Sequence, residues 1–270
     1  MSQITMNVNV ASASAARDYK ETQDKFGLVS SQLSSGKRIV SSSVDAAGAA
    51  IATKMNVNVA ALGQADRNAS QANAMLSTAE GGLEEINNIV TRLKELSVGA
   101  VNDTNGDEER AFLDLEFQAL VLEIDNIAER TRWNGSSLLD ADTTYNFQVA
   151  DKSTDLLGID IGASTSSDLG LTGLDLSSDA AAAQDAVDTA VGTLNTSRAQ
   201  IGAAVKSLEV IKSSLGSSIE KAQNGASVLE DMDVATGITE FANLQTRLQV
   251  QQAVVMQNNQ QTSALSKFFN

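Results

Sequence analysis

The side chains best suited to acid–base chemistry in this sequence are the adjacent carboxylates Glu108 and Glu109, within the segment NDTNGDEER. Paired carboxylates can act as a general acid and a general base. This segment, however, has the composition of a turn followed by the start of a helix, where carboxylates stabilise the positive end of the helix dipole. We therefore expect these two residues to support a helix rather than a reaction.

The sequence lacks the residues that most other kinds of catalysis require. The chain of 270 residues contains no Cys and no His, which excludes thiol nucleophiles, most zinc sites and the commonest general base at neutral pH. It has no H-E-x-x-H zinc protease motif and no Gly-rich phosphate loop ending in Lys-Ser or Lys-Thr. The sequence predicts a protein that is not an enzyme and that uses no cofactor or metal.

The composition favours long helices. Hydrophobic residues make up 42% of the chain, but aromatic residues only 4%, and there is no Pro. Aliphatic side chains can cover one another along the seam between packed helices. Pro breaks helix interiors, so its absence suits helices of unusual length.

The negative charge is concentrated in the middle of the chain. The net charge is −15, and residues 100–190 hold 19 acidic and 4 basic residues, which accounts for the whole excess. An acidic chain is a poor partner for nucleic acid, and no segment approaches the roughly 18 consecutive apolar residues of a membrane span. The N-terminal segment does not resemble a Sec-type signal, so we expect any export to use another route.

Three segments repeat apolar residues at alternating spacings of three and four, the pattern of a helix that buries one stripe. One set is Leu76, Ala79, Leu83, Ile86, Val90 and Leu93. Another is Leu113, Phe117, Leu120, Ile124 and Ile127. The longest is Val187, Val191, Leu194, Ile201, Val205, Leu208, Leu215, Ile219, Ala222, Ala226 and Leu229, with Arg198 and Lys212 in two of its seam positions. These repeats predict long helices packed against one another.

Turn and capping residues predict where these helices begin and end. Ser42 with Asp45 resembles a capping box, and Asn105 is a candidate cap for the next helix. The Asn-Gly turn within residues 132–137 is expected to end that helix. One of residues 177–179 is expected to start the long helix that follows.

In the middle of the chain, apolar and polar residues alternate with a period of two. Tyr145, Phe147 and Val149 alternate with polar residues, as do Leu157, Ile159 and Ile161, and the segment ADKSTD separates the two runs. This pattern predicts a β-hairpin, with a loop rich in Gly, Ser and Thr after it. The expected fold is mainly α, a long antiparallel helical bundle or coiled coil with a small β-hairpin at mid-chain.

Both ends of the chain carry apolar heptads, and residues 1–16 and 241–270 contain only two charged side chains, Arg247 and Lys267. The repeating residues are Tyr19, Phe26 and Leu33 near the start, and Val234, Phe241, Leu248, Val255 and Phe269 near the end. The opposite face near the end is rich in Gln and Asn rather than Lys and Glu, so it lacks the ion pairs that support a lone helix. We expect these ends to be largely unfolded in dilute solution and to become ordered when other helices bury them.

Four blocks of the sequence resemble bacterial flagellin. They are LSSGKRIVSSSVDAAGAAIATKM, RNASQANAMLSTAEGGLEEINNIVTRLKELSVGAVNDTN, LEIDNIAERTRWNGSSLLD and SVLEDMDVATGITEFANLQTRLQVQQAVVMQNNQ. The blocks occur in the family's order and cover nearly the whole chain. Residues 141–178 leave room only for a hairpin and a loop, so the chain resembles a short form that lacks the large outer domains of many flagellins.

The resemblance implies a structural subunit that polymerises into the flagellar filament for motility. It implies secretion of the unfolded chain through the flagellar type III export apparatus and assembly at the distal tip of an extracellular flagellum. The implied partners are other copies of the chain in a helical homopolymer, the export apparatus and its chaperone, the filament cap and the hook-junction proteins.

The resemblance also implies a division of the chain. In the family, the paired terminal helices form the inner tube of the filament and the other long helices form an outer tube. The expected parts are an N-terminal inner-core helix at 1–33, a spoke at 34–42, outer-tube helices at 43–140, a hairpin and surface loop at 141–178, a C-terminal outer-tube helix at 179–228 and a C-terminal inner-core helix at 229–270. Polymerisation through the inner core would use the eight heptad residues of the two ends named above.

The spoke of the family corresponds here to a segment that includes Gly36, Lys37, Arg38 and Asp45. Gly36 would give the bend its freedom, and we expect the two cations to pair with carboxylates of a neighbouring subunit. The family usually has paired acids before its AAG motif, whereas Val44 precedes Asp45 here, so one spoke contact is expected to be absent.

A further family feature is recognition by a host innate immune receptor through an Arg, a Leu and a Glu. The matching positions are Arg92, Leu96 and Glu116, and Gly99 replaces a Gln that is common in the family. The same three residues could instead serve lateral packing between subunits.

Other functional classes share some of these features. The hook–filament junction protein shares terminal helices with flagellin, but the blocks through RWNGSSLL favour the filament subunit. Another secreted helical type III protein, such as a translocator, would usually carry a long apolar membrane-active segment, and this sequence has none.

Overall fold

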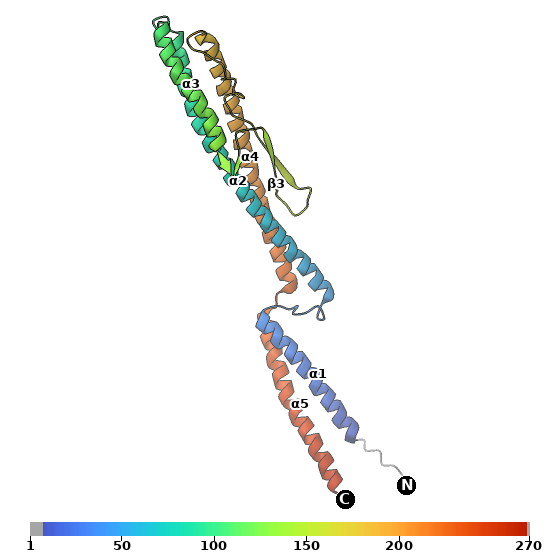
Figure 1. The fold of residues 1–270 in the computed structure, drawn as a ribbon. Helices are drawn as coiled ribbons and strands as arrows, with labels where there is room; N and C mark the ends of the chain where they lie inside the picture. The colour runs from blue at the N-terminus through green and yellow to red at the C-terminus, as the bar shows by residue number, and fades with distance from the viewer. Residues whose placement is uncertain (1–7, 269–270) are drawn as a thin grey trace. The chain divides into compact units, whose positions relative to one another are not determined.

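A computed structural model describes residues 8–268, and the side chains of residues 12–260. The described chain is mostly helical, with two small antiparallel hairpins in the middle of the sequence (Figure 1). It divides into two compact units. Unit 1 combines the chain up to Val57 with the chain from Lys221 onward, and unit 2 is Asn58–Glu220.

Nine elements follow one another along the described residues. They are α1 (Val8–Ser35), α2 (Ala46–Val101), α3 (Asp107–Arg130), β1 (Arg132–Trp133), β2 (Ser136–Ser137), β3 (Thr143–Gln148), β4 (Leu156–Ile161), α4 (Ala180–Glu230) and α5 (Val234–Phe268). The predicted mainly α architecture is confirmed. In unit 1 the helices α1 and α5 pack against each other, and in unit 2 parts of α2 and α4 pack with α3 (Figure 1).

The core of unit 2 follows the predicted seams. All six apolar residues of the α2 heptad, from Leu76 to Leu93, are completely buried, and so are Phe117 and Ile124 of α3. On α4 the buried seam includes Val187 and Leu194, with Ile201 and Leu208 further along. The heptads identified the helix faces correctly because burial of aliphatic side chains is the main force holding such helices together.

A charged pair fills the break in the α4 seam. Arg198 stands in a seam position, and its Nε donates a hydrogen bond of 2.8 Å to Oε1 of Glu80 on α2. Both side chains are about one-third exposed. The charge is accepted at this position because its carboxylate partner comes from the facing helix.

The helix starts differ from the prediction in two places. Asp45, not Ser42, caps α2, because its Oδ1 accepts a hydrogen bond of 2.8 Å from the backbone N–H of Gly48. Gly106 precedes α3 without a side-chain cap, and Asn105 instead donates through Nδ2 to the carbonyl of Gly99 at 2.7 Å, closing the end of α2.

Two turns behave as their sequences indicate. Asp179 caps α4 by accepting a hydrogen bond of 3.0 Å from the N–H of Ala182. The segment after α3 is more than a turn, since it forms the two-residue strands β1 and β2 around Asn134 and Gly135. These two residues have φ values of 49° and 88°, as the tightest hairpin turns require.

The predicted mid-chain hairpin is β3 and β4. Tyr145 pairs with Ile159 and Phe147 pairs with Leu157 across the antiparallel ladder. The loop after it, at residues 162–178, is irregular as predicted but is held firmly on unit 2. It buries Leu169, Leu171 and Leu176, and Ser166 donates two hydrogen bonds to Asp125 of α3 at 2.7 and 2.8 Å.

Candidate assembly surfaces

The predicted terminal seam is formed by α1 and α5. The rings of Phe26 and Phe241 stack with centroids 4.7 Å apart and planes inclined by 29°. Val29 and Leu244 are buried beside them, at 4% and 5% exposure. The two helices are thus joined by an aromatic contact and a narrow aliphatic seam.

Much of this seam remains only partly covered. Tyr19 and Leu33 on α1, and Leu248 and Val255 on α5, are each half-buried. Several other apolar side chains of α5 are largely exposed, namely Ile238, Val250, Val254 and Met256. The apolar residues of each helix extend beyond the line where α1 and α5 touch, and one partner helix cannot cover them all. The pair therefore keeps apolar side chains exposed to solvent.

Val234 does not belong to the seam between α1 and α5. It is the first residue of α5 and is 52% exposed. The position that faces α1 is taken by Gly237, where an added Cβ would lie 3.2 Å from Cδ2 of Leu33. Phe269, the last member of the predicted set, lies outside the described residues.

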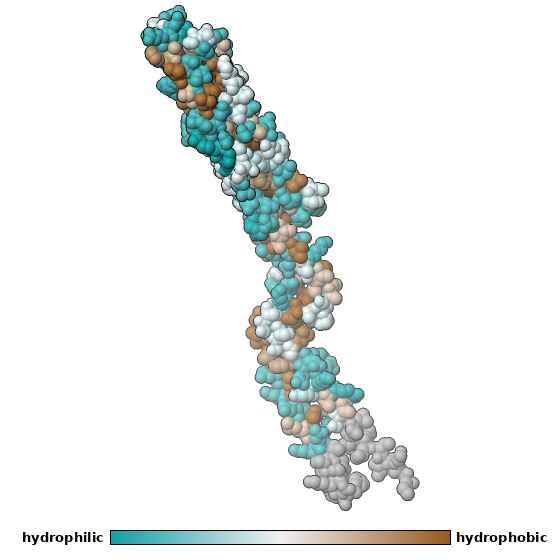
Figure 2. Space-filling view, viewed as in Figure 1, coloured by the Kyte–Doolittle hydropathy of each residue, from teal (hydrophilic) through white to brown (hydrophobic). Residues whose placement is uncertain are grey.

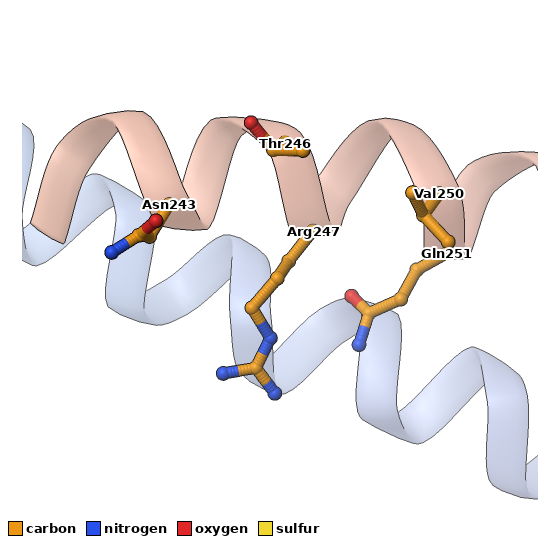
Figure 3. A pocket seen from close by; sticks show the side chains of 5 residues that line it. All are labelled: Asn243, Thr246, Arg247, Val250 and Gln251. Atoms are coloured by element: carbon orange, nitrogen blue, oxygen red, sulfur yellow. The ribbon is translucent and has the colours of Figure 1, made fainter.

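A groove of about 550 Å³ lies along α5. It is lined by Asn243, Thr246, Arg247, Val250 and Gln251, and the side chains of Arg247 and Gln251 extend from α5 toward α1 (Figure 3). Oε1 of Gln251 is buried and has no hydrogen-bond partner among the described residues.

The predicted spoke is a tight joint within unit 1. Gly36 follows α1 with φ 69°, a left-handed conformation that Gly adopts easily. Its carbonyl accepts from the N–H of Met232 at 2.9 Å, and the N–H of Arg38 donates to the carbonyl of Glu230 at 2.6 Å. The bend thus pairs with the segment between α4 and α5, an association that no sequence pattern indicated.

The two spoke cations bind groups of their own chain. Nζ of Lys37 lies 2.8 Å from Oε2 of Glu230, and Nη2 of Arg38 lies 3.5 Å from Oδ2 of Asp45 and 2.8 Å from the carbonyl oxygen of Leu229. Within the single chain both cations thus have partners, and their pairing with carboxylates of a neighbouring subunit stays a prediction. The sequence could not reveal the intrachain partner of Lys37 because Glu230 is almost 200 positions away from it.

These contacts shift two titrations. The hydrogen bond from Lys37 to Glu230, together with the attraction between their charges, raises the pKa of Lys37. The N–H of Gly48, and then the guanidinium of Arg38, lower the pKa of Asp45. Asp45 therefore has two roles, as the cap of α2 and as an ion-pair partner within the joint.

Gly48 permits this arrangement. It is buried, and an added Cβ would lie 2.9 Å from Cδ1 of Ile39 and would also overlap the carboxylate of Asp45. The glycine after the two alanines at the start of α2 is thus needed for close packing of the joint rather than for a bend.

Arg92, Leu96 and Glu116 do not form one exposed surface. Arg92 bridges Glu95 on its own helix and Glu116 on α3, each at 2.8 Å, and these partners raise its pKa. Leu96 is only 3% exposed and belongs to the core of unit 2. Contact of these three residues with a receptor or a neighbouring subunit stays a prediction, and Leu96 is buried in this conformation.

Sequence reasoning missed a second apolar stripe on α3. Phe112, Leu115 and Leu122 are 64%, 68% and 64% exposed, and Ala119 between them is exposed as well. These four residues repeat at spacings of three and four on the face away from the buried heptad. The signal was present in the sequence, but the stronger seam through Phe117 concealed it.

The described residues contain no group of three or more acidic side chains placed to hold a metal ion. Among the same residues, no helix has the length and apolar character needed to cross a membrane.

Comparison with known proteins identifies the family. The profile of the bacterial flagellin N-terminal helical region matches residues 6–144, and that of the C-terminal helical region matches residues 184–269. A flagellin of Halalkalibacterium halodurans is 34% identical over 269 residues, covering 96% of this chain and 97% of the relative. A flagellin of Listeria monocytogenes is 29% identical, with 98% and 99% covered.

Longer relatives and a solved structure agree. The phase 2 flagellin of Salmonella typhimurium is 36% identical over 188 residues, which are 70% of this chain but only 36% of that protein. A crystal structure of Bacillus cereus flagellin superposes with a TM-score of 0.50 at 29% identity, covering 55% of this chain and 88% of that one. Both terminal regions and nearly the full length of short relatives are matched. The chain is therefore a member of the bacterial flagellin family, in a short form without a large outer domain.

Proposed function

We propose that this chain builds the flagellar filament by packing the α1 and α5 helices of many copies into a common core. The role of a flagellin as structural subunit of an extracellular filament follows from family membership. The observation that supports the terminal helices as the contact is their incomplete seam, with half-buried Tyr19, Leu33, Leu248 and Val255 around the stacked Phe26 and Phe241.

The composition of these helices suits such a core. Residues 245–261 contain seven Gln and only one charged residue, Arg247. Amides can pair with one another in a buried contact at a smaller desolvation cost than charges.

The spoke and the charged cluster on α2 and α3 have supporting roles in this proposal. The joint at Gly36, Lys37, Arg38 and Asp45 would set the path of the chain between inner and outer parts. Arg92 and Glu116, which are each about half exposed, would lie at lateral contacts between subunits. Recognition of Arg92, Leu96 and Glu116 by a host innate immune receptor stays a prediction, and it would require the buried Leu96 to become accessible.

We also propose that the chain is exported unfolded by the flagellar type III apparatus with a chaperone and is assembled beneath the filament cap, next to hook-junction proteins. The absence of Cys and Pro supports this, because neither disulfides nor Pro isomerisation can delay threading or refolding. Expression in a flagellated host deleted for its own flagellin, followed by assay of the medium, tests the export step.

Electron microscopy of the purified full-length chain tests the function itself. Concentrated protein is seeded with fragments of its own assemblies, and elongation to filaments of uniform diameter is expected. A chain that stays monomeric at every concentration tried, with or without seeds, would contradict the proposal.

A further inference from the structure

The sequence contains three Asn-Gly pairs, and the fold places each of them in a different environment. They are Asn105–Gly106 in the turn after α2, Asn134–Gly135 in the hairpin of β1 and β2, and Asn224–Gly225 inside α4. An Asn followed by Gly loses its side-chain amide readily in water, because Gly has no side chain to hinder attack by its backbone nitrogen. We propose that Asn134 is a site of spontaneous deamidation in the folded chain, and that the fold suppresses the same reaction at the other two pairs.

The reaction balances with water as its only co-reactant. The backbone nitrogen of Gly135 attacks Cγ of Asn134, so a new C–N bond forms and the bond from Cγ to Nδ2 breaks. The proton of the Gly135 N–H leaves with Nδ2 as ammonia. Water then opens the cyclic succinimide at one of its two carbonyl groups, which gives either Asp or isoaspartate. Nothing is oxidised or reduced.

Both reacting groups are free in the hairpin of β1 and β2. Neither the side-chain amide of Asn134 nor the N–H of Gly135 makes a hydrogen bond within the described part of the chain, and both residues are exposed. A Cβ added to Gly135 would meet no atom within 4 Å, so the nitrogen is open to approach. Figure 2 shows hydrophilic surface where α3 ends and this hairpin follows, as a reaction with water requires.

The hairpin must open for the ring to close, and little holds it shut. Among the residues that the structure describes, Asn134 is the only one other than Gly with a positive φ, at 49°. Ring closure requires rotation about its Cα–C bond, away from the geometry of the turn. The ladder that opposes this rotation consists of only two residue pairs, and so short an element opens locally at small cost.

The other two pairs are held by bonds that the reaction would have to break. Nδ2 of Asn105 donates a hydrogen bond of 2.7 Å to the carbonyl of Gly99, and Nε of Arg110 donates to the carbonyl of Asn105 at 3.2 Å. The side-chain amide and the peptide group of Asn105 are thus both fixed. Asn224 and Gly225 lie within α4, where the N–H of Gly225 takes part in the hydrogen bonding of the helix. Ring closure there would unwind part of a long helix.

Deamidation of Asn134 would change the hairpin in two ways. Either product adds a negative charge at the turn. Isoaspartate also lengthens the main chain by one methylene group, and a two-residue turn cannot take up this extra length and keep the pairing of its strands. The modified hairpin would therefore lose the register that pairs Arg132 with Ser137.

Mass spectrometry of the full-length chain tests the ranking of the three sites. The protein is held in mildly alkaline buffer, folded or in concentrated urea, and peptides from each pair are followed for the mass increase of an amide that becomes an acid. In urea we expect similar rates at the three sites. In the folded chain, Asn134 is expected to react at least about 10-fold faster than Asn105 and Asn224. Equal rates in the folded chain, or an unreactive Asn134, would overturn the inference.

Two matched substitutions provide a second measurement. Asn134→Asp keeps a residue that tolerates positive φ but has no amide to lose, and Asn224→Asp makes the same change inside α4. Isoelectric focusing of aged, folded protein should show that new acidic species accumulate much more slowly in the Asn134→Asp variant than in the wild type, and at the wild-type rate in the Asn224→Asp variant. Equal accumulation in all three proteins would contradict the assignment. Neither measurement involves polymerisation, so a negative result leaves the proposed function unaffected.

Discussion

Lys37 and Glu230 form an ion pair of 2.8 Å between the bend that follows α1 and the last residue of α4. Two backbone hydrogen bonds, from the N–H of Arg38 to the carbonyl of Glu230 and from the N–H of Met232 to the carbonyl of Gly36, join the same two segments. The two connections within unit 1 are thus fastened to each other, and the joint has a defined geometry although it consists of only a few residues.

The ion pair can be tested by reversing its charges. Lys37→Glu places a carboxylate beside Glu230 and Asp231, so we expect a small decrease in melting temperature and weaker filament assembly. The double variant Lys37→Glu with Glu230→Lys restores opposite charges and should recover both properties. If the double variant is as impaired as the single one, the pairing with Glu230 does not stabilise the joint.

The conformation of Gly36 predicts a cost for any side chain there. Gly36→Ala is expected to reduce the free energy of unfolding by about 1–2 kcal/mol, because a non-Gly residue is disfavoured at positive φ. No atom lies within 4 Å of the added Cβ, so the effect would be conformational only. The matched control is Gly27→Ala, which also meets open space but lies inside α1 and should be stabilising by about 1 kcal/mol. Urea unfolding of the three proteins, each assembled into filaments so that α1 is ordered, measures both effects, and a neutral Gly36→Ala would contradict the assignment.

The lowered pKa of Asp45 predicts that the joint loses stability in acid. Its pKa is lowered in the folded chain by the N–H of Gly48 and by Arg38. Its contribution to stability is therefore complete above its ordinary pKa of 3.8 and is lost as the pH falls through the lowered value. Asp45→Asn should remove this part of the acid-induced loss of helicity, measured by circular dichroism between pH 5 and about 2. Asp24→Asn, an exposed change within α1, serves as the control, and identical acid profiles for both variants would exclude the role of Asp45.

Removing one ring of the Phe26–Phe241 stack is expected to weaken filament assembly. Phe241→Ala removes a half-buried ring and is expected to weaken the terminal pair by about 2 kcal/mol, which corresponds to a critical concentration roughly 30-fold higher. Phe241→Leu keeps much of the apolar volume and should lose less. Sedimentation of filaments at a series of protein concentrations provides the comparison, and wild-type assembly by Phe241→Ala would count against the terminal seam.

Removal of residues 241–270 is the severest test of the terminal helices. The truncated chain should remain a soluble, partly helical monomer, because the core of unit 2 lies entirely within the part retained. It should form no filaments, since most of α5 is gone. Ordinary filaments from this chain, seen by electron microscopy, would refute the role of the C-terminal helix.

Much of the fold could be predicted because its forces are local and periodic. The six α2 seam residues from Leu76 to Leu93 were identified correctly because a 3-4 spacing leaves only one face to bury. The β3–β4 hairpin followed in the same way from a period of two. The capping residues could not be assigned in this way, because Ser42, Asp45 and Asn105 all have side chains suited to a helix cap. Only the backbone geometry decides which of them accepts a hydrogen bond from the first turn of a helix.

The candidate surfaces were only partly predictable. The terminal heptads placed Phe26 and Phe241 on facing stripes, but the pattern also assigned Val234 to the seam, and Gly237 takes that place. The partners of Lys37 and Arg38 could not be found, because contacts between distant residues leave no periodic signal. The burial of Leu96 could not be foreseen for a related reason, since a matching motif gives the residue type but not whether the side chain is buried.

The stacked rings of Phe26 and Phe241 come from opposite ends of the chain, and this fixes an order of events. A chain that emerges from its N-terminus presents Phe26 long before Phe241 exists to meet it. Only a chain that extends through Phe241 can close this contact. If the terminal seam mediates assembly as proposed, a product that ends before residue 241 would lack the ring needed to join a growing filament.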